Sequence, residues 1–122
     1  MTTPKEMTIA AVKALEEKKG SDIKILETAN LTTLADYFIL CTATSITHLK
    51  TLSDETEKAL KILGETPHHI EGYRSGSWVL LDFGCLVVHL FLQEAREFYD
   101  LERLWSDARM TDGSDFVKDA LR

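Results

Sequence analysis

The sequence has few of the residues that mark an oxidised, metal-binding or membrane-spanning protein. Its two cysteines, Cys41 and Cys85, lie in or beside apolar runs and lack the C-x-x-C spacing of a zinc site. No stretch approaches the roughly 20 consecutive apolar residues of a membrane span, and the N-terminal residues lack the apolar core of a signal peptide. We therefore expect a reduced, metal-free protein of the cytoplasm that does not contact membranes.

Basic residues are scarce relative to acidic ones. Fourteen Lys and Arg against twenty Asp and Glu give a formal net charge of −6. A chain of this charge repels a phosphate backbone, and it cannot gain the counterion-release energy that drives nucleic-acid binding. We expect no direct binding to nucleic acid, and a basic protein is the more plausible partner.

The periodicity of apolar residues predicts a single α/β or α+β domain. It indicates helices over residues 4–19, 45–63 and 94–108, which alternate with strands over 22–28, 35–43, 68–73, 77–83 and 86–92. Thr3, Pro4 and Glu6 form an N-cap signature, and Gly20 and Gly64 are expected to stop the first two helices. The order favours a mixed sheet of about five strands packed by helices over residues 1–108. Residues 109–122 lose the periodicity and are expected to form a loosely ordered tail, with at most a turn of helix at its end.

The last two strands place unusual residues on one face. If Gly84 and Cys85 form a two-residue type II′ loop, the strands pair from Trp78 opposite Phe91 to Phe83 opposite Leu86. One face of this hairpin is then wholly apolar. The other face carries Trp78, Leu80, Asp82, Val87, His89 and Phe91. A buried, unpaired carboxylate costs several kcal/mol, so Asp82 must reach water or a partner.

Two interpretations of that face stay open at this point. In the first, Trp78 and Phe91 lie under the last helix, His89 bonds to a neighbouring backbone group and Asp82 caps the turn. In the second, the aromatic pair is the anchor of a binding surface, and the charge at its rim selects a basic partner.

The enzymatic alternatives find little support. Gly76 and Ser77 before a strand that bears Asp82 are typical of nucleotidyltransferases, but the second metal-binding carboxylate would fall on Gly84. The adjacent His68 and His69 point to opposite faces of a strand, and no serine or cysteine has the context of a nucleophile. These observations favour a binding protein, without catalytic or metal-binding residues and without a cofactor.

The segments ADYFILCTATS, WVLLDFG, VVHLF and REFYDLERLW together resemble the ribosomal silencing factor family, also called Iojap. The resemblance implies a small mixed-sheet domain, similar to a nucleotidyltransferase core without its catalytic carboxylates. It also implies binding to universal large-subunit protein fourteen on the large ribosomal subunit. A bound factor would sterically prevent the small subunit from joining, and so repress translation under nutrient limitation.

The resemblance further implies which residues contact the partner. Trp78 and Phe91 would supply apolar contact, Asp82 would meet a Lys or Arg of the partner, and Tyr99 would offer its hydroxyl. Leu101, Leu104 and Trp105 are assigned to core packing. The full set of expected partner-binding residues is Trp78, Leu80, Asp82, His89, Phe91, Arg96, Phe98 and Tyr99.

The sequence departs from the family pattern at two places. Ile46-Thr47-His48 stands where an arginine is common, and Gly84-Cys85 stands where Gly-Asp is common. Two alternatives to the simple repressor also remain. The domain could be a nucleotidyltransferase-like nucleotide-binding domain or enzyme, and the Trp78 face could close a homodimer in the free protein.

Overall fold

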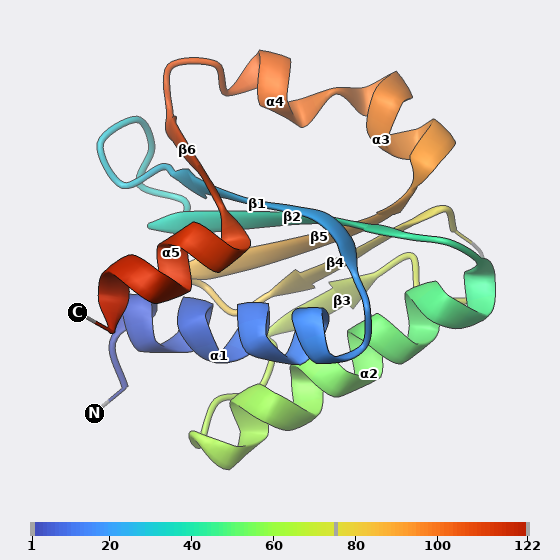
Figure 1. Cartoon of the computed structure of the whole chain (residues 1–122), viewed down its shortest axis with the longest axis horizontal. Helices are drawn as coiled ribbons and strands as arrows, with labels where there is room; N and C mark the ends of the chain where they lie inside the picture. The colour runs from blue at the N-terminus through green and yellow to red at the C-terminus, as the bar shows by residue number, and fades with distance from the viewer. Residues whose placement is uncertain (1, 75, 122) are drawn as a thin grey trace.

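The computed structural model describes residues 2–74 and 76–121, in which two layers of helices enclose one mixed sheet (Figure 1). The six strands lie in the order β3-β4-β5-β2-β1-β6, and all pairs are antiparallel except β2 with β5. In chain order the elements are α1 (Pro4–Glu17), β1 (Ser21–Glu27), β2 (Tyr37–Ala43), α2 (Ile46–Ile62), β3 (His69–Glu71), β4 (Trp78–Asp82), β5 (Leu86–Leu92), α3 (Gln93–Tyr99), α4 (Leu101–Leu104), β6 (Arg109–Asp112) and α5 (Gly113–Ala120). The predicted mixed α+β domain is confirmed, with one strand more than expected.

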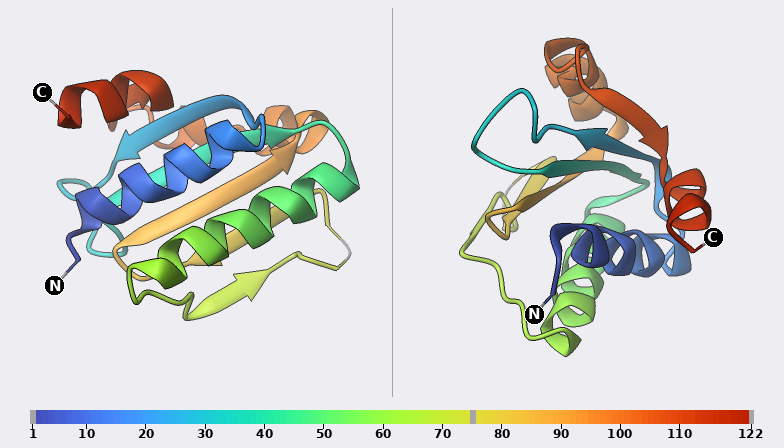
Figure 2. Two further views of the ribbon diagram at one scale, coloured as in Figure 1. Left: turned by 60° about the horizontal axis from the view of Figure 1, so that its bottom comes forward. Right: turned by 90° about the vertical axis from the view of Figure 1, so that its left-hand side faces the viewer.

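The sheet separates two apolar cores. Helices α1, α2 and α5 cover one face, while α3 and α4 lie over the other (Figures 1 and 2). The first and larger core contains the predicted apolar face of the hairpin, where Val79, Leu81, Val88 and Leu90 are fully buried. The second core lies under α3 and α4 and is built around Phe38, Leu40 and Phe91, with Trp78 and Trp105 partly buried against it.

Helix α1 begins as its sequence predicts and ends at Glu17, two residues earlier than expected. The Thr3 hydroxyl accepts the Glu6 N–H, and the Glu6 carboxylate accepts the Thr3 N–H, which forms a complete capping box. The left-handed residue after the helix is Lys19, with φ of 63°, and not Gly20. The Lys19 and Gly20 N–H groups donate to the carbonyls of Glu16 and Leu15, which is the bonding pattern of a Schellman motif. Gly20 is instead a close-packing site, because a Cβ there would lie 2.5 Å from the Cys41 sulfur.

Helix α2 ends at Ile62, and Gly64 is the predicted glycine that stops it. Gly64 has φ of 83°, and the Gly64 and Glu65 N–H groups donate to Lys61 and Leu60. At the other end, the Ser45 hydroxyl caps the helix by accepting the His48 N–H. The His48 imidazole accepts the Thr44 N–H at Nδ1, and its Nε2 lies 2.8 Å from the Lys18 carbonyl oxygen. His48 therefore links the end of α1 to the beginning of α2. It lies in the segment where the resemblance led us to expect an arginine.

The β4–β5 hairpin has the predicted register. Trp78 pairs with Phe91 at one end and Asp82 with Val87 at the other. The Phe83 N–H donates to the Leu86 carbonyl across the loop, and Gly84 has φ of 86° as the first position of a type II′ turn requires.

The segment after β5 differs from the expected single helix over 94–108. It is broken at Asp100, whose φ of 44° is left-handed, so that α3 and the short α4 meet at an angle over the second core (Figure 1). This segment contains no glycine or proline from which the break could be predicted.

The C-terminal segment is ordered and does not form the expected loose tail. Strand β6 pairs antiparallel with β1, from Glu27 opposite Arg109 to Lys24 opposite Asp112. Helix α5 follows, and its Phe116 is buried against the ring of Tyr37 at 5.5 Å between centroids. A four-residue strand has too few residues for a periodic signal, and it forms here because β1 offers a free edge.

Candidate functional site

A cluster of aromatic rings joins the β4–β5 hairpin to α3. The Trp78 ring stacks on Phe91 with 5.1 Å between centroids, and it also contacts the Tyr99 ring at 4.6 Å. Phe98 meets Tyr99 edge to face at 5.1 Å. Phe91 is buried, whereas Phe98 and Tyr99 are 81% and 49% exposed. The cluster thus runs from the second core out to the surface.

His89 is a buried, neutral member of this cluster. Its Nδ1 accepts the Trp78 indole N–H at 3.1 Å, which places the proton of the neutral ring on Nε2. Burial lowers the pKa of His89 to about 4, and the nearby Asp82 carboxylate opposes this shift only in part. The Nε2 atom has no hydrogen-bond partner among the described residues. His89 therefore satisfies the indole of Trp78, where the first interpretation expected a backbone partner.

Asp82 caps the hairpin turn. Its Oδ1 accepts the Gly84 N–H at 2.7 Å, while the side chain stays half-buried at the end of β4. Leu80 is also half-buried on the same face. Among the hydrogen bonds of the described residues, the Asp82 side chain accepts only this one, through one of its two carboxylate oxygens.

The structure divides this face into a buried part and an exposed part. Phe91 and His89 are buried beneath the face, as the first interpretation predicts. Trp78, Leu80 and Asp82 are half-exposed, and with Phe98 and Tyr99 they form a surface that we call the aromatic face. Leu104 was expected in the core but is 72% exposed on α4, because the break at Asp100 turns it outward.

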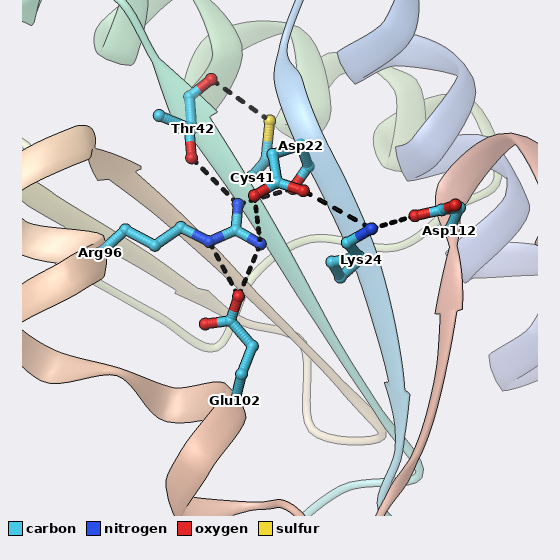
Figure 3. A network of polar contacts seen from close by, with 7 residues as sticks. All are labelled: Asp22, Lys24, Cys41, Thr42, Arg96, Glu102 and Asp112. Atoms are coloured by element: carbon cyan, nitrogen blue, oxygen red, sulfur yellow. Dashed lines mark hydrogen bonds and ion pairs between the residues drawn. The ribbon is translucent and has the colours of Figure 1, made fainter.

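Arg96 does not lie on the aromatic face. Its side chain is only 4% exposed, and its guanidinium contacts the carboxylates of Asp22 and Glu102 and the hydroxyl of Thr42 (Figure 3). This inward position differs from the expected contact with a partner. The roles of Asp22 and Glu102 were not visible in the sequence, because residues 22, 96 and 102 have no local spacing that would connect them.

The described residues offer no obvious catalytic chemistry. Burial raises the pKa of the Cys41 thiol to about 12, and it also raises the pKa of Cys85, so neither thiol is activated. Within residues 2–74 and 76–121, no group of three His, Cys, Asp or Glu side chains is placed to hold a metal ion. In the same part of the chain, no helix has the length and apolar character needed to cross a membrane.

A hollow of about 670 Å³ lies at the carboxyl ends of β2 and β5, where open α/β sheets commonly bind nucleotides. Its lining contains Ile46, Leu92 and Glu94 but no lysine or arginine. Phosphate groups would find no cation there, and a magnesium ion would find one carboxylate. The composition of this hollow disfavours the nucleotide-binding alternative.

Comparison with known proteins identifies the relatives of this domain. The model of the family described as "Ribosomal silencing factor during starvation" matches residues 1–121. The chain belongs to the ribosomal silencing factor family. The family match extends through β6 and into α5, beyond the boundary at residue 108 that the sequence suggested.

Curated relatives of the silencing factor family occur in bacteria and organelles. The ribosomal silencing factor of Chromobacterium violaceum is 41% identical over 82% of this chain and 82% of the relative. That of Bacillus subtilis is 33% identical over 84% of this chain and 86% of the relative. A mouse protein named mitochondrial assembly of ribosomal large subunit protein 1 is 34% identical over 78% of this chain but only 43% of its own length. The bacterial names describe regulatory factors and indicate no enzymatic activity.

Two solved structures share the fold. A crystal structure of a Chromobacterium violaceum protein superposes with a TM-score of 0.83 at 39% identity, and it covers 86% of this chain and 88% of that one. A crystal structure of a Bacillus halodurans protein has a TM-score of 0.74 at 30% identity, over 84% and 93% of the two chains.

Proposed function

We propose that this silencing factor binds the large ribosomal subunit through its aromatic face and prevents the small subunit from joining. The protein that it contacts would be universal large-subunit protein fourteen, on the surface of the large subunit that meets the small one. This action would take place in the cytoplasm and would lower translation when nutrients are limiting. Membership of the silencing factor family supports the general role, and the composition of the aromatic face supports the mode of binding.

The exposed aromatic pair on α3 carries the proposal. Phe98 is 81% exposed and Tyr99 is 49% exposed, although each would bury well over 100 Å² in a core. Trp78 adjoins them and its N–H is already bonded to His89, so its accessible surface is mainly apolar. Large aromatic side chains at the centre of a patch are the residues that most often dominate protein–protein affinity.

The charge around the aromatic face fits a basic partner. Acidic residues are concentrated in the segment that carries α3 and α4, where the only basic side chains are the buried Arg96 and the exposed Arg103. The acidic residues of this segment are Glu94, Glu97, Asp100 and Asp107, besides Glu102, whose charge is paired with Arg96. Complementary charge would raise the rate of encounter with a basic ribosomal protein and disfavour direct contact with rRNA.

Repression by occupancy requires no chemical step. The binding free energy only has to keep the factor on a surface that the small subunit would otherwise use. The extent of repression should therefore follow the fraction of large subunits occupied.

Co-sedimentation with separated large subunits, small subunits and joined ribosomes tests the proposal. The wild-type protein should pellet with large subunits alone, and Phe98→Ala should weaken that binding by about tenfold or more. Ile62→Ala is the matched control, because Ile62 is 82% exposed on α2 and lies on the opposite side of the sheet. Both variants should fold normally, since neither side chain is buried.

Three outcomes would contradict the proposal. Equal binding to both subunits would indicate a nonspecific interaction, and absence of binding to large subunits would remove the function. Unchanged affinity of Phe98→Ala would place the interface away from the aromatic face. The partner is tested separately, by measuring whether purified universal large-subunit protein fourteen competes with large subunits for the factor.

A further inference from the structure

Helix α3 is held to the domain by very few buried side chains. Only Ala95 and Arg96 of α3 are buried, and only Leu101 of α4. Ala95 buries one methyl group, so the apolar surface of α3 contributes little to its attachment. The residue that fixes α3 is therefore Arg96, although a buried guanidinium is costly unless its donors are paired.

The guanidinium of Arg96 bridges the break between the two helices. Its Nε and Nη2 atoms donate to Glu102 Oε2 on α4 at 3.3 and 3.0 Å (Figure 3). Between the two residues lies Asp100, which is left-handed and makes no capping hydrogen bond with its side chain. The left-handed conformation is strained for an aspartate, and contacts elsewhere must hold it. The Arg96–Glu102 pair is placed to do so.

The same guanidinium is anchored on an irregularity in β1. Nη1 donates to the Asp22 carbonyl at 2.6 Å and to the Thr42 hydroxyl at 3.0 Å. The register of β1 against β2 shifts between Ser21 and Lys24, and Asp22 within this bulge has φ of 48°. A bulge removes a residue from the ladder and redirects its backbone groups. Here it frees the carbonyl of Asp22 to accept from Arg96.

The network continues from β1 to the C-terminal segment. The Asp22 carboxylate lies 3.5 Å from Arg96 Nη2 and 3.6 Å from Lys24 Nζ, and Lys24 also donates to Asp112 at the end of β6 (Figure 3). Asp22 is thus the carboxylate that Arg96 and Lys24 have in common. The position of α3 is coupled in this way to β1 and β6, the last two strands at one edge of the sheet.

We propose that Arg96, Glu102 and Asp22 form a clamp that sets the bend between α3 and α4 and thereby positions Phe98 and Tyr99 on the aromatic face. The three residues are positioning residues and do not touch the partner. The inference rests on the proposed function, because it assigns to the clamp the presentation of the partner-binding rings. Tyr99 is the first residue affected, since its ring lies against Trp78 only while α3 keeps its orientation.

Glu102→Ala is the test variant, because Glu102 is partly exposed and its loss leaves the Asp22 and Thr42 contacts of Arg96 in place. Glu17→Gln on α1 is the control for the change in net charge, since Glu17 is exposed on the other side of the sheet. Glu102→Ala should lower the affinity for purified large subunits by about tenfold, and Glu17→Gln should leave it unchanged. Hydrogen exchange of Glu102→Ala should quicken in α3 and α4 alone.

A double-mutant cycle separates positioning from a general loss of structure. If Glu102 acts through the aromatic rings, Glu102→Ala should cost much less affinity when Phe98→Ala is already present. Additive losses in the cycle would overturn the clamp, as would unchanged affinity of Glu102→Ala or faster exchange throughout the domain. Failure of the wild-type protein to bind large subunits would overturn the proposed function instead. In that case, quickened exchange confined to α3 and α4 would still support the clamp.

Discussion

Acidification should destabilise this protein through His89 before most carboxylates are protonated. His89 is buried and accepts the Trp78 indole N–H, so the folded protein favours its neutral form. Its pKa is lowered from 6.5 to about 4 in the folded state, whereas the unfolded chain should titrate near 6.5. Between these values the unfolded state binds one more proton than the folded state. The free energy of unfolding therefore falls as the pH is lowered from about 6.5 to 4 and does not fall further through this group.

The size of the effect follows from the pKa difference. Each pKa unit corresponds to about 1.4 kcal/mol, so the loss attributable to His89 should reach about 2 kcal/mol by pH 5 and about 3 kcal/mol by pH 4. This is a large share of the 5–15 kcal/mol by which domains of this size are usually stable.

Urea unfolding of the wild type and of His89→Asn, from pH 7 to pH 4, isolates this contribution. Asparagine places an amide oxygen where Nδ1 lies and does not titrate, so the variant should lose stability at pH 7 through its smaller volume but show a flatter pH dependence. Subtracting one curve from the other removes the contribution of the carboxylates to the pH dependence, because the two proteins have the same carboxylates. Parallel curves from pH 7 to pH 5 would refute the buried, neutral histidine.

Three other predictions concern the backbone and the assembly of the protein. Lys19→Gly should raise the free energy of unfolding by about 1 kcal/mol and Gly64→Ala should lower it by about as much, because both residues are left-handed at helix ends; urea titrations of the two variants should shift in opposite directions. Gly72→Ala should lower the free energy of unfolding by about 3 kcal/mol or more, because the new Cβ would lie 2.0 Å from the Trp78 carbonyl oxygen. A thermal unfolding midpoint close to that of the wild type would contradict this. If the aromatic face also closes a homodimer, sedimentation at several concentrations should show a dimer that Tyr99→Ser weakens, and a monomer at all concentrations would exclude it.

The hairpin was predictable to the residue because its signal is local. A glycine at the first position of a two-residue loop fixes the turn type, and the turn fixes every cross-strand pair from Asp82 to Trp78. The capping box at Thr3 and Glu6 was predictable for the same reason. Such features depend on residues within a few positions of one another.

The features that escaped prediction depend on distant contacts. The helical period runs unbroken through Asp100, and the break becomes favourable only when Arg96 finds Glu102 on one side and the Asp22 carbonyl on the other. Strand β6 likewise depends on the free edge of β1 more than on its own four residues. Arg96 itself was expected at a surface, since arginine is rarely buried without partners that a sequence does not reveal.

The division of the hairpin face into a buried and an exposed part explains how a small domain can offer aromatic rings to a partner without collapsing around them. His89 takes up the indole N–H, and Phe91 supports the Trp78 ring from below, so Trp78 is held without a partner present. A ring that is already ordered loses little entropy on binding, and more of its burial appears as affinity. Exposure of Phe98 and Tyr99 in the free protein carries a risk of aggregation. The acidic residues of the α3–α4 segment oppose aggregation by keeping the protein soluble. In the proposed function, the same acids would repel a second copy of this chain but attract a basic protein. That difference would give the face a specificity that the aromatic rings alone would lack.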